Sequence, residues 1–266
     1  MTGGARGIQS IEISGRILKA LVRKCEPMML KELAQEADLT PAQCHAYLTS
    51  LRNVGLVQQG TDTGLYRMGP FAMRLGIAWL HNIELPATAM RSLKALTDEL
   101  GFMSLIAVWG QFGPTIVHVN AGVWPSALNV RQGTLFSLTG TATGRIFAAF
   151  GTADDLYGRI ERELERSEPS RSLGAVVARE EFTQQVATAR LKGFAIAECR
   201  PIPDMNAVSA PIFDAQGHLF SVATLLGPSR IMPVEENAPA VQRLLAVTRA
   251  LHNEASPQPT VNGEVK

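Results

Sequence analysis

The first quarter of the chain carries apolar positions at helical spacing, interrupted by short polar breaks. A first helix is predicted over residues 8–24, and Glu26-Pro27 ends it. A second is predicted over residues 30–37, before Asp38-Leu39-Thr40-Pro41 breaks the pattern. Thr40 suits the N-cap of a third helix, and Pro41 suits its first position, where an N–H would be unpaired in any case. One face of this third helix is apolar at Cys44, Leu48 and Leu51.

A hairpin is predicted directly after these helices. Apolar or β-favouring residues at 56–59 and 65–68 flank a turn of Gly, Asp and Thr at 60–64. Three helices followed by a hairpin make a winged helix-turn-helix, a module that places one helix in the major groove of DNA. The alternative is a helical pair in another all-α domain with solvated polar residues, and the hairpin argues against it.

The rest of the chain predicts a linker helix and then an α+β domain. An amphipathic stretch at 70–85 suits a linker helix or helix pairing between protomers, and a further helix covers 86–100. Strands are predicted at 103–109, 115–120, 127–131 and 136–138, followed by helices at 141–150, 153–165 and 179–192. Strands return at 194–199, 208–213 and 219–226, and a last helix is predicted at 234–253. This order favours an antiparallel sheet with segregated helices.

Length and charge agree with this division. We predict a winged helix-turn-helix at 1–69, a linker helix at 70–85, the α+β domain at 86–255 and a disordered tail at 256–266. Eight Lys and Arg against six Asp and Glu give the front a charge of +2, and 17 against 18 give the remainder −1. This asymmetry has the sign expected for a DNA-binding front end. With neither a secretory signal nor a membrane-length apolar run, we expect a cytoplasmic protein without a membrane partner.

The third helix presents candidate DNA contacts on the face opposite its apolar positions. Gln43 is placed to pair with adenine, and Arg52 is placed to reach a phosphate. His45, Tyr47 and Thr49 are weaker candidates for base or backbone contacts. The predicted DNA interface comprises Thr40, Gln43, His45, Tyr47, Thr49, Arg52, and from the wing Thr61 and Arg67.

Two loops of the rear domain are candidate ligand sites. Residues 137–145 form a hydroxyl- and glycine-rich turn entering a helix, which offers N–H groups and a positive dipole end to an anion. An ordinary helix cap explains it equally well. The polar loop at 198–206 lies between two strands, where it closes over a ligand or serves as a plain connection. Trp124 is one of several aromatics that stack on a ligand or, more commonly, belong to the core.

Catalytic and metal chemistry are not indicated. The five histidines show no metal-ligand spacing, the three cysteines form no CxxC, and no nucleophile motif is present. The alternating Glu and Arg residues at 159–166, including Glu163, are interpreted as a solvated helix face. We therefore expect no catalytic residue, cofactor or metal.

Several strings together resemble the IclR family of bacterial transcription regulators. The similarity spans about residues 7–254 and rests on Ile8–Glu12, Leu48–Val57, Tyr66–Gly69, Thr141–Arg145, Ala210–Asp214 with Gly217, and Gly227-Pro228. The resemblance implies that the front domain binds double-stranded operator DNA and that the rear domain is GAF-like and senses a small carboxylate. It also implies a homodimer or a dimer of dimers. By resemblance to the family's effector pocket, the predicted effector site comprises Trp124, Leu138, Thr141, Ala142, Thr143, Glu198 and Ala207.

The chain departs from the family pattern at both sites. Pro41-Ala42-Gln43 stands where the family often has Lys-Ser-Thr, and Ala46 where it often has Arg. In the effector loop, Ala197 replaces a frequent acidic residue and Ala207 a frequent Cys. These changes suggest a more apolar pocket that takes an aromatic acid. The rival hypotheses are an enzyme retaining the rear fold, with Thr143 and Glu198 as the residues to test, and a protein-interaction adaptor.

Overall fold

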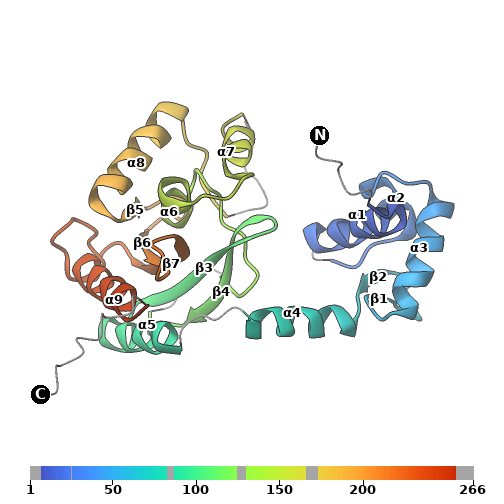
Figure 1. The fold of residues 1–266 in the computed structure, drawn as a ribbon, viewed down its shortest axis with the longest axis horizontal. Coiled ribbons are helices and arrows are strands. Elements are labelled where there is room, and N and C mark those ends of the chain that lie inside the picture. The colour runs from blue at the N-terminus through green and yellow to red at the C-terminus, as the bar shows by residue number, and fades with distance from the viewer. Residues whose placement is uncertain (1–6, 25, 83–86, 125–129, 166–172, 256–266) are drawn as a thin grey trace, which may run out of the picture. The chain divides into compact units, whose positions relative to one another are not determined.

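The computed structural model describes residues 7–24, 26–82, 87–124, 130–165 and 173–255. The chain divides into two compact units, Met1–Glu84 and Leu85–Lys266. Figure 1 labels the helices and strands of both units.

The front unit is a three-helix bundle with a wing. Its helices are α1 (Gln9–Lys24), α2 (Leu30–Glu36) and α3 (Pro41–Asn53). The wing strands β1 (Val57–Gln59) and β2 (Tyr66–Met68) pair antiparallel, and helix α4 (Pro70–Asn82) follows. Met28 joins the wing to the bundle, because its backbone N–H and carbonyl both bond to Tyr66 at 2.9 and 2.8 Å. The predicted winged helix-turn-helix is confirmed.

A single apolar core holds the bundle together. Cys44, Leu48 and Leu51 are buried along one side of α3, as their spacing predicted. They pack with Ile17, Leu21, Met28, Leu33, Val57 and Tyr66. Burial also raises the pKa of the Cys44 thiol, so this cysteine behaves as a core residue rather than a reactive one. Cys25 lies outside the described residues.

The rear unit is built on a five-stranded antiparallel sheet. Its strands are β3 (Met103–Gly110), β4 (Gly113–Asn120), β5 (Ala195–Glu198), β6 (Met205–Phe213) and β7 (Leu219–Pro228). They lie in the order β4-β3-β7-β6-β5, so β5 is an edge strand. The helices are α5 (Ala87–Leu100), α6 (Ala142–Phe150), α7 (Leu156–Leu164), α8 (Arg179–Lys192) and α9 (Pro239–Ala255). The predicted α+β class is confirmed.

Helices cover both faces of this sheet (Figure 1). Helices α5 and α9 pack together against β3, β6 and β7. Helix α6 packs on the other face against β5, β6 and β7, and α8 packs on α6. Because Ala195 faces Ser209 and Ala197 faces Ala207 across the strand pair, these four side chains share the α6 side.

Three predicted elements differ in the structure. The predicted strand at 136–138 is wrong, because only isolated bridges form at Leu135 and Phe136 and a turn follows. The last helix begins at Pro239 instead of 234, since a proline in the helix interior would remove a backbone hydrogen bond. Strand β6 begins at Met205, so Asn206 and Ala207 lie in a strand and the loop is shorter than expected.

Three further predictions concern the start of a helix and two segments that lie wholly or partly outside the described residues. Helix α7 starts at Leu156, three residues later than expected. In the predicted strand at 127–131, residues 127–129 lie outside the described residues and Val130 and Arg131 are not in a strand. The predicted tail at 256–266 also lies outside the described part of the chain.

No helix in the described ranges is long and apolar enough to cross a membrane.

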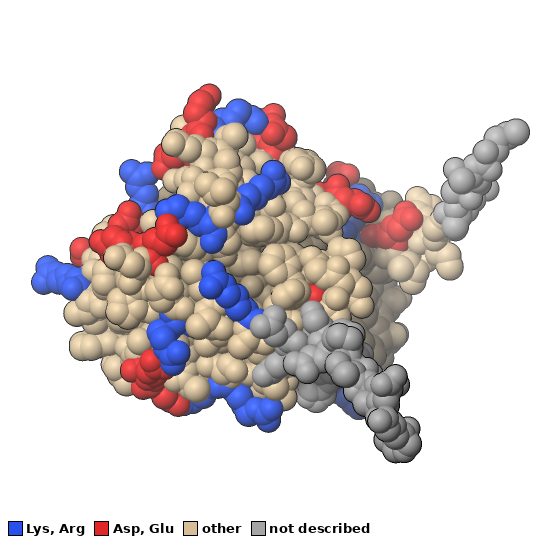
Figure 2. Space-filling model, turned by 60° about the vertical axis from the view of Figure 1, so that its left-hand side comes forward, with Lys and Arg blue, Asp and Glu red and all other residues tan. Residues whose placement is uncertain are grey.

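On the face shown in Figure 2, basic and acidic side chains alternate over short distances. This distribution fits the formal net charge of +1.

Candidate functional site

A reciprocal capping box fixes the beginning of α3. The Thr40 hydroxyl accepts from the Gln43 backbone N–H at 3.3 Å, and Gln43 Oε1 accepts from the Thr40 backbone N–H at 3.1 Å. Gln43 Oε1 also accepts from the Thr40 hydroxyl at 3.1 Å. Two N–H groups that a helix start leaves unpaired are thereby satisfied.

This arrangement restricts what Gln43 can offer to DNA. Bidentate pairing with adenine uses both the oxygen and the nitrogen of the side-chain amide. The oxygen of Gln43 is occupied by Thr40, which leaves the Nε2 donor. The spacing Thr40-x-x-Gln43 is itself the sequence pattern of a capping box, so the capping role of Gln43 could have been predicted from the sequence.

The remaining predicted contacts on α3 divide into exposed and packed residues. His45, Thr49 and Arg52 are exposed on the side of the helix away from the core. The Thr49 hydroxyl donates to the His45 carbonyl at 3.0 Å. Tyr47 is half-buried and packs against the apolar core of the bundle. Tyr47 thus supports the position of α3 through its ring.

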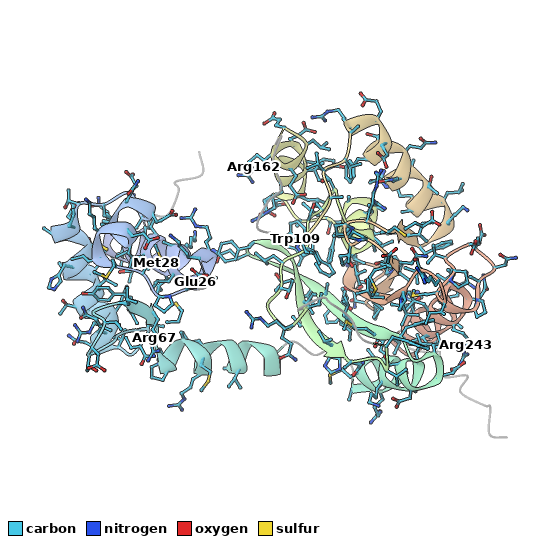
Figure 3. All side chains as sticks on the ribbon, turned by 180° about the vertical axis from the view of Figure 1, so that it is seen from behind. Glu26, Met28, Arg67, Trp109, Arg162 and Arg243 are labelled. Atoms are coloured by element: carbon cyan, nitrogen blue, oxygen red, sulfur yellow. The ribbon has the colours of Figure 1, made fainter. Side chains whose placement is uncertain are left out.

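A hydrogen-bond chain links α3 to the wing. Arg52 Nη1 donates to Gln59 Oε1 at 3.0 Å, and Gln59 Nε2 donates to the Gly64 carbonyl at 3.0 Å. The guanidinium is therefore held at the junction of helix and hairpin. Thr61 in the wing turn and Arg67 on β2 are both exposed, and Figure 3 labels Arg67 on this strand. Arg67 is paired with Gln58, the neighbour of Gln59, so the arginines of α3 and of the wing belong to adjacent positions of the hairpin.

In the rear unit, the start of α6 is packed tightly against the sheet. Thr141 is the N-cap, and its hydroxyl accepts from the Gly144 N–H at 2.9 Å. A Cβ at Gly144 would lie 2.1 Å from the Ser137 carbonyl oxygen, so only glycine fits. The turn at 137–145 therefore contains an ordinary helix cap, which was the alternative to a ligand site, and a closely packed glycine.

Thr143 forms a buried hydroxyl cluster with two strand residues. Its Oγ1 lies 2.8 Å from Thr224 Oγ1 and 3.3 Å from Ser209 Oγ, and these two are 2.7 Å apart. All three residues are at most 2 % exposed. The cluster places hydrogen-bonding groups on the inner face of the sheet beneath α6.

Glu163 of α7 fills the anion-binding turn that precedes α6. Its carboxylate accepts from the Ser137 hydroxyl at 2.7 Å and from the backbone N–H groups of Leu138 and Thr139 at 3.2 and 3.1 Å. The Thr139 hydroxyl donates to it as well, at 3.2 Å. The interpretation of Glu163 as part of a solvated face is therefore wrong. The predicted strand ends before Leu138, because the backbone N–H groups of Leu138 and Thr139 pair with this carboxylate instead of a strand.

The predicted effector residues fall in three places. Leu138 and Ala142 belong to one core cluster against which Ala207 packs, and Thr141 and Thr143 lie at the same helix start. Trp124 is 47 % exposed and lies beside Gly101, outside that cluster. Glu198, on the alternate side of β5, lines a groove at the sheet edge. The structure thus brings together five of the seven.

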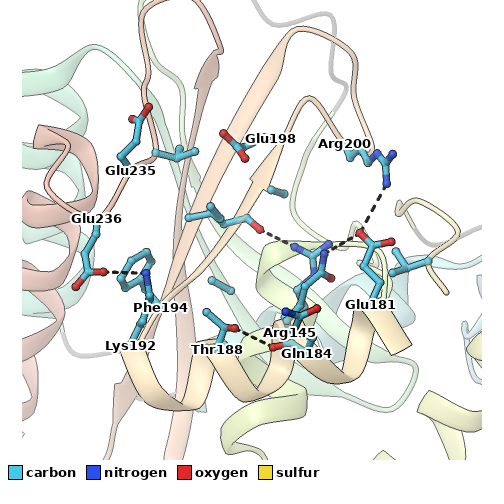
Figure 4. A pocket seen from close by; sticks show the side chains of 17 residues that line it. Arg145, Glu181, Gln184, Thr188, Lys192, Phe194, Glu198, Arg200, Glu235 and Glu236 are labelled. Atoms are coloured by element: carbon cyan, nitrogen blue, oxygen red, sulfur yellow. Dashed lines mark hydrogen bonds and ion pairs between the residues drawn. The ribbon is translucent and has the colours of Figure 1, made fainter. Parts of the chain in front are cut away.

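The groove, of about 600 Å³, runs between edge strand β5 and helix α8 (Figure 4). Arg145 reaches into it from α6 and donates through Nη1 to the Ile196 carbonyl at 2.6 Å. Burial lowers the pKa of Arg145 from its ordinary value, while the neighbouring Glu181 carboxylate raises it. Sequence reasoning did not select Arg145, because its partner lies on a strand far along the chain. Among the described residues, no group of three His, Cys, Asp or Glu side chains could hold a metal ion.

Comparison with known proteins gives two family matches. Residues 10–60 match the IclR helix-turn-helix domain, and residues 77–253 match the bacterial transcriptional regulator IclR C-terminal domain. The chain is 27 % identical to the glycerol operon regulatory protein of Streptomyces griseus, over 91 % of this chain and 93 % of that protein. The matched family models and this relative are all named as regulators and not as enzymes. This agrees with the prediction that the chain has no catalytic residue.

Solved structures show the same fold. Pseudomonas aeruginosa HmgR is 31 % identical, with a TM-score of 0.57, covering 95 % of this chain and all of that one. An IclR homolog from Microbacterium hydrocarbonoxydans, solved in complex with 4-hydroxybenzoate, is 14 % identical with a TM-score of 0.72. That match covers 92 % of this chain and 98 % of the other.

Proposed function

Because this chain belongs to the IclR family of DNA-binding bacterial transcription regulators, we propose that it binds operator DNA in response to a small organic acid. The observation that carries this proposal is the α3 surface. Its polar face is exposed, its start is capped, and Arg52 joins it to the wing. Such a surface matches the placement of a helix in the major groove beside a wing on the backbone.

The DNA contacts divide by chemistry. Arg52 and Arg67 bind phosphates, because guanidinium groups pair well with phosphate oxygens, and Thr61 is a neutral donor to the backbone. Thr40 acts indirectly, since its hydroxyl is engaged in the cap that positions the helix. His45 and Thr49 face the base edges, and Gln43 adds its Nε2 donor while its oxygen remains in the cap. Tyr47 supports the helix from the core side. The surface carries few donors, so its sequence preference rests on a small number of contacts.

The effector site lies beneath the start of α6. Thr143 with Ser209 and Thr224 supplies hydroxyl groups, and Leu138, Ala142 and Ala207 supply apolar surface. An aromatic acid fits this composition, with its ring against the apolar residues and its carboxylate accepting hydrogen bonds from the hydroxyl groups. The 4-hydroxybenzoate complex of a protein with this fold supports that ligand class. Thr141 positions the helix start, whereas Trp124 and Glu198 lie outside this cluster and are not assigned to the site.

The response to effector requires an assembly of at least two chains. We place the dimer contact on α4, where Phe71, Met73, Leu75 and Ile77 are 41–63 % exposed. Exposed apolar side chains gathered on one element in this way mark a protein–protein interaction site. The effector then shifts the spacing between paired reading helices, by its differential affinity for two arrangements.

Binding of the purified chain to DNA tests this function. Fluorescence anisotropy would compare one selected operator fragment with a random duplex, each with and without 4-hydroxybenzoate. Specific binding that changes with the acid supports the proposal. Equal affinity for both duplexes would contradict sequence-specific reading, the absence of binding to either would favour an adaptor that docks on proteins, and turnover of the acid would favour an enzyme.

A further inference from the structure

The groove between β5 and α8 lies apart from the hydroxyl cluster assigned to the effector. Its lining comes from α8, from β5, from the 234–236 loop and from Arg145, Arg200 and Val177. Neither Thr143 nor Ala207 lines it. Its volume of about 600 Å³ is within the range of small-molecule sites.

Arg145 is the most buried charge in this groove. Its side chain is 5 % exposed, and among the described residues only Nη1 has a partner, the Ile196 carbonyl. The buried Nε–H has no partner at all. Nε and Nη2 together form the edge of a guanidinium that matches a carboxylate in two parallel hydrogen bonds. An unpaired buried donor is costly, so this edge calls for an acceptor that the protein does not supply.

Gln185, in the same groove, has an unpaired hydrogen-bond acceptor. Its Nε2 donates to the Glu181 carboxylate at 2.9 Å, which fixes the orientation of the amide. Its Oε1 is buried and has no partner. One unpaired donor edge and one unpaired acceptor therefore line a single groove.

Some charged side chains of the groove are paired within the protein, and the unpaired ones indicate which charges a bound ligand should carry. Arg200 lies 3.8 Å from Glu181, and Lys192 lies 2.8 Å from Glu236. Arg145 makes no direct ion pair, although the Glu181 carboxylate lies near it, and no ion pair within the described ranges engages Glu198 or Glu235. Figure 4 shows both of these carboxylates across the groove from α8. The uncompensated charges are thus one cation and two anions.

We propose that this groove binds a small zwitterion, a free α-amino acid, with its carboxylate on the Nε–Nη2 edge of Arg145. The ammonium group donates to Gln185 Oε1 and lies in the field of Glu198 and Glu235. A simple carboxylate leaves the glutamates uncompensated, and a simple amine leaves Arg145 unpaired. This site goes beyond the proposed effector site and does not depend on it.

Calorimetry with the full chain tests the site, using each of the twenty amino acids as probe. We expect at least one to bind, and its deaminated acid and decarboxylated amine to bind at least about tenfold more weakly, because each loses charge-assisted hydrogen bonds. Arg145→Lys keeps a donor for Ile196 but loses the two-donor edge. Gln185→Leu removes the acceptor. Each substitution should weaken binding by about tenfold or more.

Arg190→Lys is the matched control, because Arg190 also donates to a backbone carbonyl, that of Ala149, but does not line the groove. It should leave amino-acid binding unchanged, and circular dichroism would confirm that all three variants fold. The proposal is overturned if no amino acid binds, if the deaminated acid binds equally well, or if Arg145→Lys and Gln185→Leu bind like Arg190→Lys.

Discussion

Gln43 and Thr40 hold each other at the start of α3, each accepting the other's backbone N–H through its side-chain oxygen at 3.1 and 3.3 Å. The residue best suited by type to read adenine is therefore engaged in stabilising the helix that would carry it. Sequence preference then depends more on His45 and Thr49, which are exposed on the same helix.

Gln43→Ala should reduce stability more than specificity. Loss of the capping box should lower the free energy of unfolding by about 0.5–1 kcal/mol, which urea denaturation measures. Operator and random DNA should lose similar affinity. A loss on operator that exceeds the loss on random DNA by about 1–3 kcal/mol would show that Gln43 leaves the cap to read a base.

Arg52→Ala should weaken binding to every DNA sequence, because it removes a phosphate contact rather than a base contact. The slope of log affinity against log salt should fall by about one. Gln59→Ala is the matched variant, since it removes the partner of Arg52 in the wing and retains the charge. An unchanged slope in Arg52→Ala would show that this guanidinium does not contact phosphate.

Glu163→Ala should destabilise the rear unit. It leaves the backbone N–H groups of Leu138 and Thr139 without their carboxylate, at a cost of about 1–3 kcal/mol. Glu165→Ala, at an exposed site directly after the same helix, should change stability by less than about 0.5 kcal/mol. Thermal unfolding of both variants measures the difference, and equal melting temperatures would contradict the assigned role.

Thr143→Val should separate ligand binding from folding. Ser209 and Thr224 remain bonded to each other at 2.7 Å, so stability should fall by about 1 kcal/mol. Affinity for an aromatic acid that binds the wild-type chain should fall about tenfold, because the α6 hydroxyl of the cluster is lost. Calorimetry measures both chains, with Thr183→Val on the exposed side of α8 as control. Unchanged affinity would place the effector elsewhere.

The front unit was largely predictable because its signals are local. The cap at Thr40, the spacing of Cys44, Leu48 and Leu51, and the wing turn all lie within one stretch of chain. The rear unit depends on pairings that local patterns do not encode. Glu163 looks like one charge among several on α7, and its partners lie 24–26 residues earlier. Likewise, Arg145 donates to the carbonyl of Ile196, which lies 51 residues later in the chain. Neither the Glu163 contacts nor this one can be predicted from residue spacing.

We propose above that this chain is a ligand-responsive DNA-binding regulator. The most direct test is selection of genomic fragments from the source organism by the purified full chain, with and without 4-hydroxybenzoate and related aromatic acids. We expect a small set of fragments that share paired half-sites, as two-fold assembly requires, and a change in their recovery when an acid binds. Recovery indistinguishable from the input library under every condition would contradict the claim.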